Sequence, residues 1–192
     1  MWLQLGILLT FFGASLFLRR RSLVRNQRIT NSSRIYEYLF LLTVILSFIF
    51  PLGTMRSQFL LWQKSSPASY LIPPYQDISY FLNYSFYVFF AKPIIALLAA
   101  LIFLGLAKFF NKKFQERFFE PEEPYFGAIA MFLIGYPGLI FYLIIVLMSG
   151  LAGTLITRRR FSAYYLWFPV AICVIMIQKW SQLLPFWQIL KL

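Results

Sequence analysis

The chain alternates between long apolar runs and short polar connections. A helix needs about 20 mostly apolar residues to cross the hydrocarbon core of a bilayer. The apolar runs meet or approach that length and predict spanning helices over residues 2–18, 36–52, 93–110, 125–136, 139–157 and 164–178. We therefore expect an all-α, polytopic transmembrane bundle of about six spans, with residues 1–192 forming a single transmembrane domain.

Proline, glycine and aromatic residues set several of these boundaries. Pro51 and Gly53 are expected to end the second span, and residues 54–77 are predicted to form a loop. Residues 78–91 are crowded with aromatic rings and predict an interfacial helix that leads into the third span. A single helix over 125–156 would be about 48 Å long against a core of about 30 Å, so Tyr136-Pro137-Gly138 is expected to divide it. The tail, 178–192, is predicted to be interfacial.

The net charge of +12 comes from basic blocks that separate the apolar runs. These blocks lie in 19–34, 108–117 and 158–160. Cytoplasmic loops of membrane proteins carry such an excess of Lys and Arg, so we place all three blocks in the cytoplasm and both termini outside. Contact with anionic lipid headgroups accounts for the charge, and nucleic-acid binding is rejected. The expected location is the plasma membrane of a bacterium or archaeon. The first run is expected to be retained as a span rather than removed as a signal peptide, because no positive residue precedes it.

The composition excludes several classes of chemistry. The chain is 60% hydrophobic and only 12% charged, which leaves no room for a separate soluble domain. It contains no His, which rules out Ser-His-Asp and Cys-His catalysis and imidazole ligation of zinc or haem. Cys173 is the single cysteine, so no intrachain disulfide is possible. No metal and no cofactor are expected.

Carboxylates are few and concentrated. Four of the six acidic residues lie in the loop 111–124, at Glu116, Glu120, Glu122 and Glu123. Acidic residues at the start of a helix interact favourably with its dipole, so a solvated helix start is the simplest interpretation of the last three. Glu37, just inside the second span, is expected to pair with Arg34 at the inner boundary.

The order of these features resembles the catalytic core of the prepilin peptidase family. The first span ends in Arg19-Arg20-Arg21-Ser22-Leu23, and Arg28-Ile29-Thr30-Asn31 stands where the family has a basic stretch ending in Arg-Ile-Pro-Asn. Glu120-Pro121-Glu122-Glu123 stands at the family's Gly-x-Gly-Asp motif. It precedes Gly127-Ala128-Ile129-Ala130-Met131 and Gly135-Tyr136-Pro137-Gly138. Ser149-Gly150-Leu151-Ala152-Gly153-Thr154 leads to the Arg158–Arg160 cluster, and Trp167-Phe168-Pro169 opens the last span.

The resemblance implies a membrane-embedded aspartic protease that trims type IV prepilins from the cytoplasmic face. It places the family's second Asp at Glu123, with Glu122 beside it, and the first near Ser22 or Leu23, neither of which is acidic. Aspartic proteolysis needs two carboxylates that share a proton. The resemblance therefore implies a prepilin peptidase core that has lost catalysis, whose partners are the lipid bilayer and a prepilin-like peptide or other membrane subunits.

Two other classes of function remain open from the residues. A small structural or assembly subunit of a larger membrane complex would also have many aromatic residues and few polar ones in its spans. A transporter or channel component ranks last, because such proteins place polar or ionisable residues in mid-membrane or contain an inverted repeat.

Overall fold

The computed structural model describes residues 2–25, 32–115, 119–157 and 163–180, and the chain in these ranges is helical, without a strand. The predicted all-α class is therefore confirmed. The elements in chain order are α1 (Trp2–Arg25), α2 (Ser32–Lys64), the 3-10 helix η1 (Ala68–Leu71), α3 (Ile78–Ser85), the π-helix η2 (Phe86–Phe90), α4 (Ala91–Lys113), α5 (Glu123–Ile134), α6 (Gly138–Thr157), the 3-10 helix η3 (Ala163–Tyr165) and α7 (Trp167–Trp180).

Three of the described helices are long and apolar enough to cross a membrane. They cover Arg34–Lys64, Ile78–Lys113 and Gly138–Thr157. Three further apolar helical stretches cover 10–17 of the described residues each: Gln4–Phe17, Glu123–Ile134 and Trp167–Gln178. The structure thus supports a helical membrane protein, and three of the six predicted spans reach spanning length in it.

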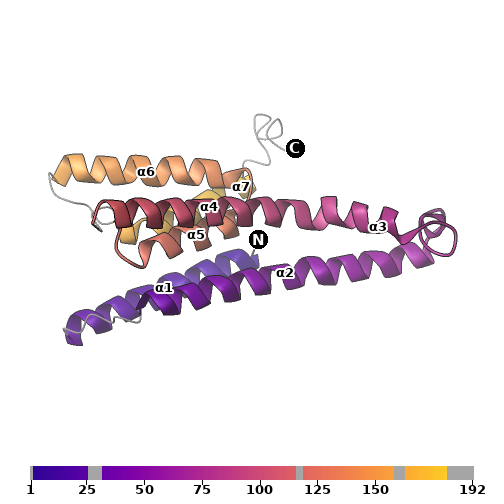
Figure 1. The fold of residues 1–192 in the computed structure, drawn as a ribbon, viewed down its shortest axis with the longest axis horizontal. Helices are drawn as coiled ribbons and strands as arrows, with labels where there is room; N and C mark the ends of the chain where they lie inside the picture. The colour runs from indigo at the N-terminus through magenta and orange to yellow at the C-terminus, as the bar shows by residue number, and fades with distance from the viewer. Residues whose placement is uncertain (1, 26–31, 116–118, 158–162, 181–192) are drawn as a thin grey trace.

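The helices form an elongated bundle with the short helix α5 at its centre. Helix α6 lies along one side and α1 and α2 along the other, with α4, α5 and α7 between them (Figure 1). Helix α5 contacts α1, α2, α4, α6 and α7, and all twelve of its residues are buried. Its length of about 18 Å at 1.5 Å per residue is little more than half of a hydrocarbon core.

The predicted break between the fourth and fifth runs is confirmed. Helix α5 ends at Ile134, Gly135 follows with a φ of +70°, and α6 begins at Gly138. A positive φ is readily adopted only by glycine, so Gly135 sets the turn together with Pro137, which cannot continue the helix. Helix α5 begins at Glu123, two residues before the predicted start of the span.

The predicted break of the second helix at Pro51 and Gly53 is wrong. Helix α2 continues through both residues to Lys64, so only residues 65–77 of the predicted loop 54–77 connect helices. Proline removes one backbone hydrogen bond but is tolerated in apolar helices when the neighbourhood supports the chain. The support here comes from Phe59 and Trp62, whose rings pack against Phe81 of α3 at centroid distances of 5.1 and 5.3 Å.

The interfacial helix predicted over 78–91 is not a separate element. α3, η2 and α4 form one continuous helix of 36 residues, Ile78–Lys113. The π turn over Phe86–Phe90 ends just before Lys92 and Pro93. Proline cannot donate the usual backbone hydrogen bond, and a local π adjustment is one way in which apolar helices accommodate it. The aromatic segment therefore extends the third span along its own axis.

The first and the last predicted spans also differ from the structure at their ends. Helix α1 continues past Leu18 through the first arginines to Arg25, and arginine is a good helix former. Helix α7 begins at Trp167, three residues after the predicted start, and η3 precedes it. The rest of the predicted interfacial tail, 181–192, lies outside the described residues.

Candidate functional site

The polar groups of the bundle gather at one end. The ends of α1, α4 and α6 and the beginnings of α2 and α5 lie together there, opposite the projecting turn between α2 and α3 (Figure 1). The basic blocks of the sequence connect or end these same helices. Consequently, the described carboxylates Glu37, Glu120, Glu122 and Glu123 lie at the charged end of the molecule rather than in its middle.

The start of α5 buries a carboxylate. Glu122 is the N-cap residue and half-buried, whereas Glu123, the first residue of the helix, is 1% exposed. The backbone turns tightly into the helix, with the Glu123 amide donating to the Glu120 carbonyl at 3.1 Å and the Tyr125 amide donating to the Glu122 carbonyl at 3.1 Å. Both acidic side chains thus lie where the positive end of the helix dipole favours a negative charge.

A hydrogen-bonded chain ties α5 to its two neighbours. The Lys108 ammonium of α4 donates to the Tyr125 hydroxyl at 2.8 Å, and that hydroxyl donates to the Glu37 carboxylate of α2 at 3.3 Å. Tyr125 is 5% exposed, while Lys108 and Glu37 are exposed. A phenol therefore bridges a cation and an anion on different helices. The partner of Glu37 is Tyr125, not Arg34 as predicted.

Two further tyrosines extend the polar centre toward α1. The Tyr36 hydroxyl is hydrogen-bonded to the Tyr164 hydroxyl, and Glu122 interacts electrostatically with Tyr36. The Tyr164 hydroxyl in turn donates to the Ser15 carbonyl at 3.0 Å. Phe126 packs edge-on against both tyrosine rings, at centroid distances of 4.7 Å to Tyr36 and 5.1 Å to Tyr164. These contacts place Glu122 beside a pair of largely buried phenols.

The connection before α5 is held by one side chain of α4. Asn111 donates its amide to the Phe119 carbonyl at 2.9 Å and accepts from the Phe119 amide at 3.1 Å. The Phe119 ring then packs against Trp167 at a centroid distance of 6.1 Å. Asn111 thus fixes the position from which the acidic sequence 120–123 enters α5.

Trp167 anchors the other side of α5. Its carbonyl accepts from the buried Tyr142 hydroxyl of α6 at 3.0 Å, and its ring packs against Phe103 of α4. Gly127 of α5 faces these rings: a Cβ added there would lie 2.5 Å from the Phe103 ring and 2.9 Å from the Trp167 ring. The α5 backbone therefore approaches α4 and α7 more closely than a side chain at Gly127 would permit.

The structure brings only part of the predicted site together. Glu122 and Glu123 both lie at the start of α5. Ser22 and Leu23 belong to α1 by their backbone, but their side chains lie outside the described part of the molecule. In the described ranges, no three His, Cys, Asp or Glu side chains group into a set that could hold a metal ion.

The sequence reasoning missed the tyrosines that organise this end. Each of three apolar runs starts with a tyrosine: Tyr36, Tyr125 and Tyr164. The rings of Tyr36 and Tyr164 pack against Phe126, and Tyr125, which precedes Phe126 in α5, is hydrogen-bonded to Lys108 and Glu37. A tyrosine at the basic end of three separate runs is the sequence signal that could have indicated a shared polar centre.

Comparisons with known proteins add no assignment. No protein-family model, no curated protein and no solved structure matches this chain. The function is therefore argued from the residues alone.

Proposed function

We propose that this protein is a prepilin peptidase-like membrane protein that has lost proteolysis and retains a peptide-binding centre at its cytoplasmic end. The proposal places it in the plasma membrane of a bacterium or archaeon, with the basic ends of the helices in the cytoplasm and both termini outside. The observation that supports it best is Glu123, a buried carboxylate at the first position of a short, wholly buried helix. A chain that needs only lipid-facing helices has no use for such a group.

Loss of catalysis follows from the supply of carboxylates. Aspartic proteolysis requires two carboxyl groups close enough to share a proton. Helix α1, which carries the first position in the family's order, contains no acidic residue. The single aspartate, Asp77, precedes α3 at the far end of the molecule. Glu37 is then the acidic residue of a neighbouring helix that could pair with Glu122 or Glu123, and Tyr125 already donates a hydrogen bond to it.

Co-expression with a type IV prepilin tests this loss directly. We expect the prepilin leader to remain attached, with an active prepilin peptidase as the positive control. Efficient leader removal that is abolished by Glu123→Gln or Glu37→Gln would refute the proposal and identify the catalytic pair. Removal that persists in both variants would exclude these carboxylates as catalytic groups and also refute the loss of proteolysis.

Retention of peptide binding requires a separate measurement. We expect an uncleaved prepilin to co-purify with the protein in mild detergent, and Glu122→Gln with Glu123→Gln to weaken this association. The matched control is Glu120→Gln, which removes a charge just before α5 but leaves its first turn unchanged. Equal recovery of an unrelated single-span protein would show that the association is not specific and would contradict this part of the proposal.

A structural or assembly subunit is the second candidate function. One observation favours it: the end of α2 and the helix α3 project together beyond the other helices (Figure 1), and many of their apolar side chains are exposed. This candidate predicts a stable membrane partner that co-purifies at constant stoichiometry and is lost when the projecting part of α2 and α3 is removed. If the protein purified alone and also bound prepilin, the assembly role would be disfavoured.

A further inference from the structure

Two helices of the bundle are much longer than a bilayer is thick. At 1.5 Å per residue, α2 is about 50 Å long and the continuous helix Ile78–Lys113 about 54 Å. Helix α6, with 20 residues, matches a hydrocarbon core of about 30 Å. Measured from the shared basic end, the two long helices therefore reach about 20 Å past the opposite side of the core. We call residues 52–90 the arm.

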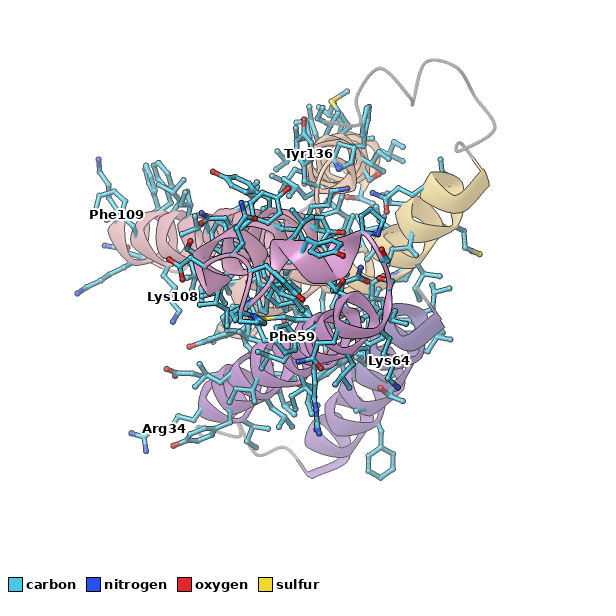
Figure 2. All side chains as sticks on the ribbon, turned by 90° about the vertical axis from the view of Figure 1, so that its right-hand side faces the viewer. Arg34, Phe59, Lys64, Lys108, Phe109 and Tyr136 are labelled. Atoms are coloured by element: carbon cyan, nitrogen blue, oxygen red, sulfur yellow. The ribbon has the colours of Figure 1, made fainter. Side chains whose placement is uncertain are left out.

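The arm is a self-packed unit. Trp62 contacts Phe81 and Tyr84, and Phe59 contacts Phe81, with centroid distances between 4.9 and 5.3 Å. Viewed from the arm end of the molecule, Phe59 lies between α2 and α3 while Lys64 lies at the outer edge (Figure 2). The aromatic rings between the two helices thus hold them together beyond the bundle.

Both helices of the arm have a backbone irregularity at the same level. Pro51 lies inside α2, and the π turn η2 covers Phe86–Phe90 on the facing helix. The ring of Phe48 stacks on that of Phe90 at 6.4 Å, which puts the two irregularities side by side. Proline and π turns are the usual sites of helix bending. The base of the arm therefore carries, on both helices, the features at which helices usually bend, and we refer to this level as the hinge.

The hinge coincides with the expected membrane boundary. About 20 residues of α2 separate Arg34 from the region of Pro51 to Arg56, and about 20 of the facing helix separate Lys112 from Lys92. Arg56 and Lys92 are both exposed and lie on either side of the hinge. Long basic side chains of this kind anchor a helix at the headgroup level.

The outer face of α3 and η2 is suited to the headgroup layer. Leu82, Phe86 and Tyr87 are 46–72% exposed on this face, which also carries the polar Asn83. Tyr80 lies at its edge: it is 49% exposed, and its ring centroid is 6.3 Å from that of Trp62. Tyrosine rings with polar tips prefer the membrane–water interface. The cations Arg56, Lys64 and Lys92 outnumber the one aspartate of the region and complement anionic phosphates.

We propose that the arm is a hinged interfacial element that leans from Pro51 and η2 onto the phospholipid headgroup layer, with the outer face of α3 against the lipid. An upright arm would hold its apolar face in water, because headgroups extend only about 5–8 Å beyond the core. Leaning at the hinge covers this face without moving the bundle. The inference rests on the proposed topology, in which the basic ends are cytoplasmic.

Spin labels at single cysteines measure this directly in reconstituted vesicles. The background is Cys173→Ala, and the labelled sites are Tyr80→Cys at the edge of the outer face of α3, Gln63→Cys on α2 at similar height, and Ile144→Cys on an exposed side of α6. The vesicles contain phosphatidylcholine with phosphatidylglycerol. Collision with oxygen, with a water-soluble nickel chelate and with a nickel chelate fixed to lipid headgroups gives the depth of each label.

We expect the label at Tyr80 to collide mainly with the headgroup-fixed chelate, the label at Gln63 mainly with the water-soluble one, and the label at Ile144 mainly with oxygen. Pro51→Ala restores a helical hydrogen-bond donor at the hinge and should reduce headgroup collisions at Tyr80 several-fold. Water-like accessibility at Tyr80 would overturn the proposal, as would a depth equal to that of Ile144. Shielding of both arm labels that grows with protein density would assign the face to a second copy and likewise overturn it.

The topology is checked independently. A membrane-impermeant thiol reagent added to intact cells should modify Gln63→Cys in the Cys173→Ala background. Lack of modification would place the arm inside the cell and refute the topology of the proposed function. Failure at the spin-label stage alone would leave that topology, and the prepilin experiments, unaffected.

Discussion

The substitution Gly127→Ala tests the close approach of α5 to its neighbours. The new methyl group would lie 2.5 and 2.8 Å from two carbons of the Phe103 ring and 2.9 Å from Trp167. Neither ring is a flexible chain end, because Trp167 is 1% exposed and packs against Phe103, Phe119 and Tyr142. Overpacking of this kind costs about 1–3 kcal/mol. The higher helix propensity of alanine returns up to about 1 kcal/mol, so we expect a net loss of roughly 1–2 kcal/mol.

The matched control is Gly105→Ala on α4, two residues from Phe103. No atom lies within 4 Å of a Cβ added at Gly105, so this variant gains the propensity of alanine without the clash. The difference between the two variants isolates the steric cost, about 1–3 kcal/mol. It is measured as the free energy of unfolding in mild detergent, with folded protein followed by size exclusion. Equal stability of the two variants would refute the packing of α5 described above, and Phe103→Leu should partly rescue Gly127→Ala if the ring is the obstacle.

Three further substitutions probe the polar contacts by the same unfolding measurement. Tyr125→Phe removes the hydroxyl that bridges α2 and α4 and should cost about 1–3 kcal/mol, because both of its hydrogen-bond partners, Lys108 and Glu37, are charged. The exposed Tyr38→Phe is its control and should change little. Tyr142→Phe removes the buried donor to α7 and should cost about 1 kcal/mol, and an unchanged midpoint would deny that contact a stabilising role. Asn111→Ala loses both hydrogen bonds to Phe119 and should cost about 1–3 kcal/mol. Asn111→Asp keeps the acceptor but sets a second acceptor against the Phe119 carbonyl, so it should cost at least as much; a smaller loss for Asn111→Asp would contradict donation by the amide.

The residues specify the helical class and the turn at 135–138 well, because composition and backbone chemistry act locally. Apolar runs without charge must form helices in a membrane, where every backbone polar group needs an internal partner. Gly135 and Pro137 act on the chain within one turn, so their effect was predictable. The same local rule misled at Pro51, where the packing of Trp62 against α3 outweighs the loss of one hydrogen bond.

The centre at the basic end was predictable only in part. Glu122 and Glu123 could be singled out, since carboxylates are rare in this chain. The link from Lys108 through Tyr125 to Glu37 joins residues 17 and 88 positions apart, and no pattern of period 3.6 relates positions so distant. Which helices meet is decided by packing of the whole bundle, so these partners emerge only from the three-dimensional arrangement.

Five other helices enclose α5, so its final position depends on helices that enter the membrane before and after it. A helix of twelve residues, one of them Glu123, is too short to be held in a bilayer by hydropathy alone, so α5 must be captured by its neighbours as they assemble. Helix α7, which is synthesised after α5 and α6, supplies Trp167 on one side of it. Until α7 arrives, that side of α5 would be open to lipid, and Glu123 would lack part of its surroundings. A chain cut before α7 should therefore retain α2, α4 and α6 as spans yet lose α5 to quality-control proteolysis.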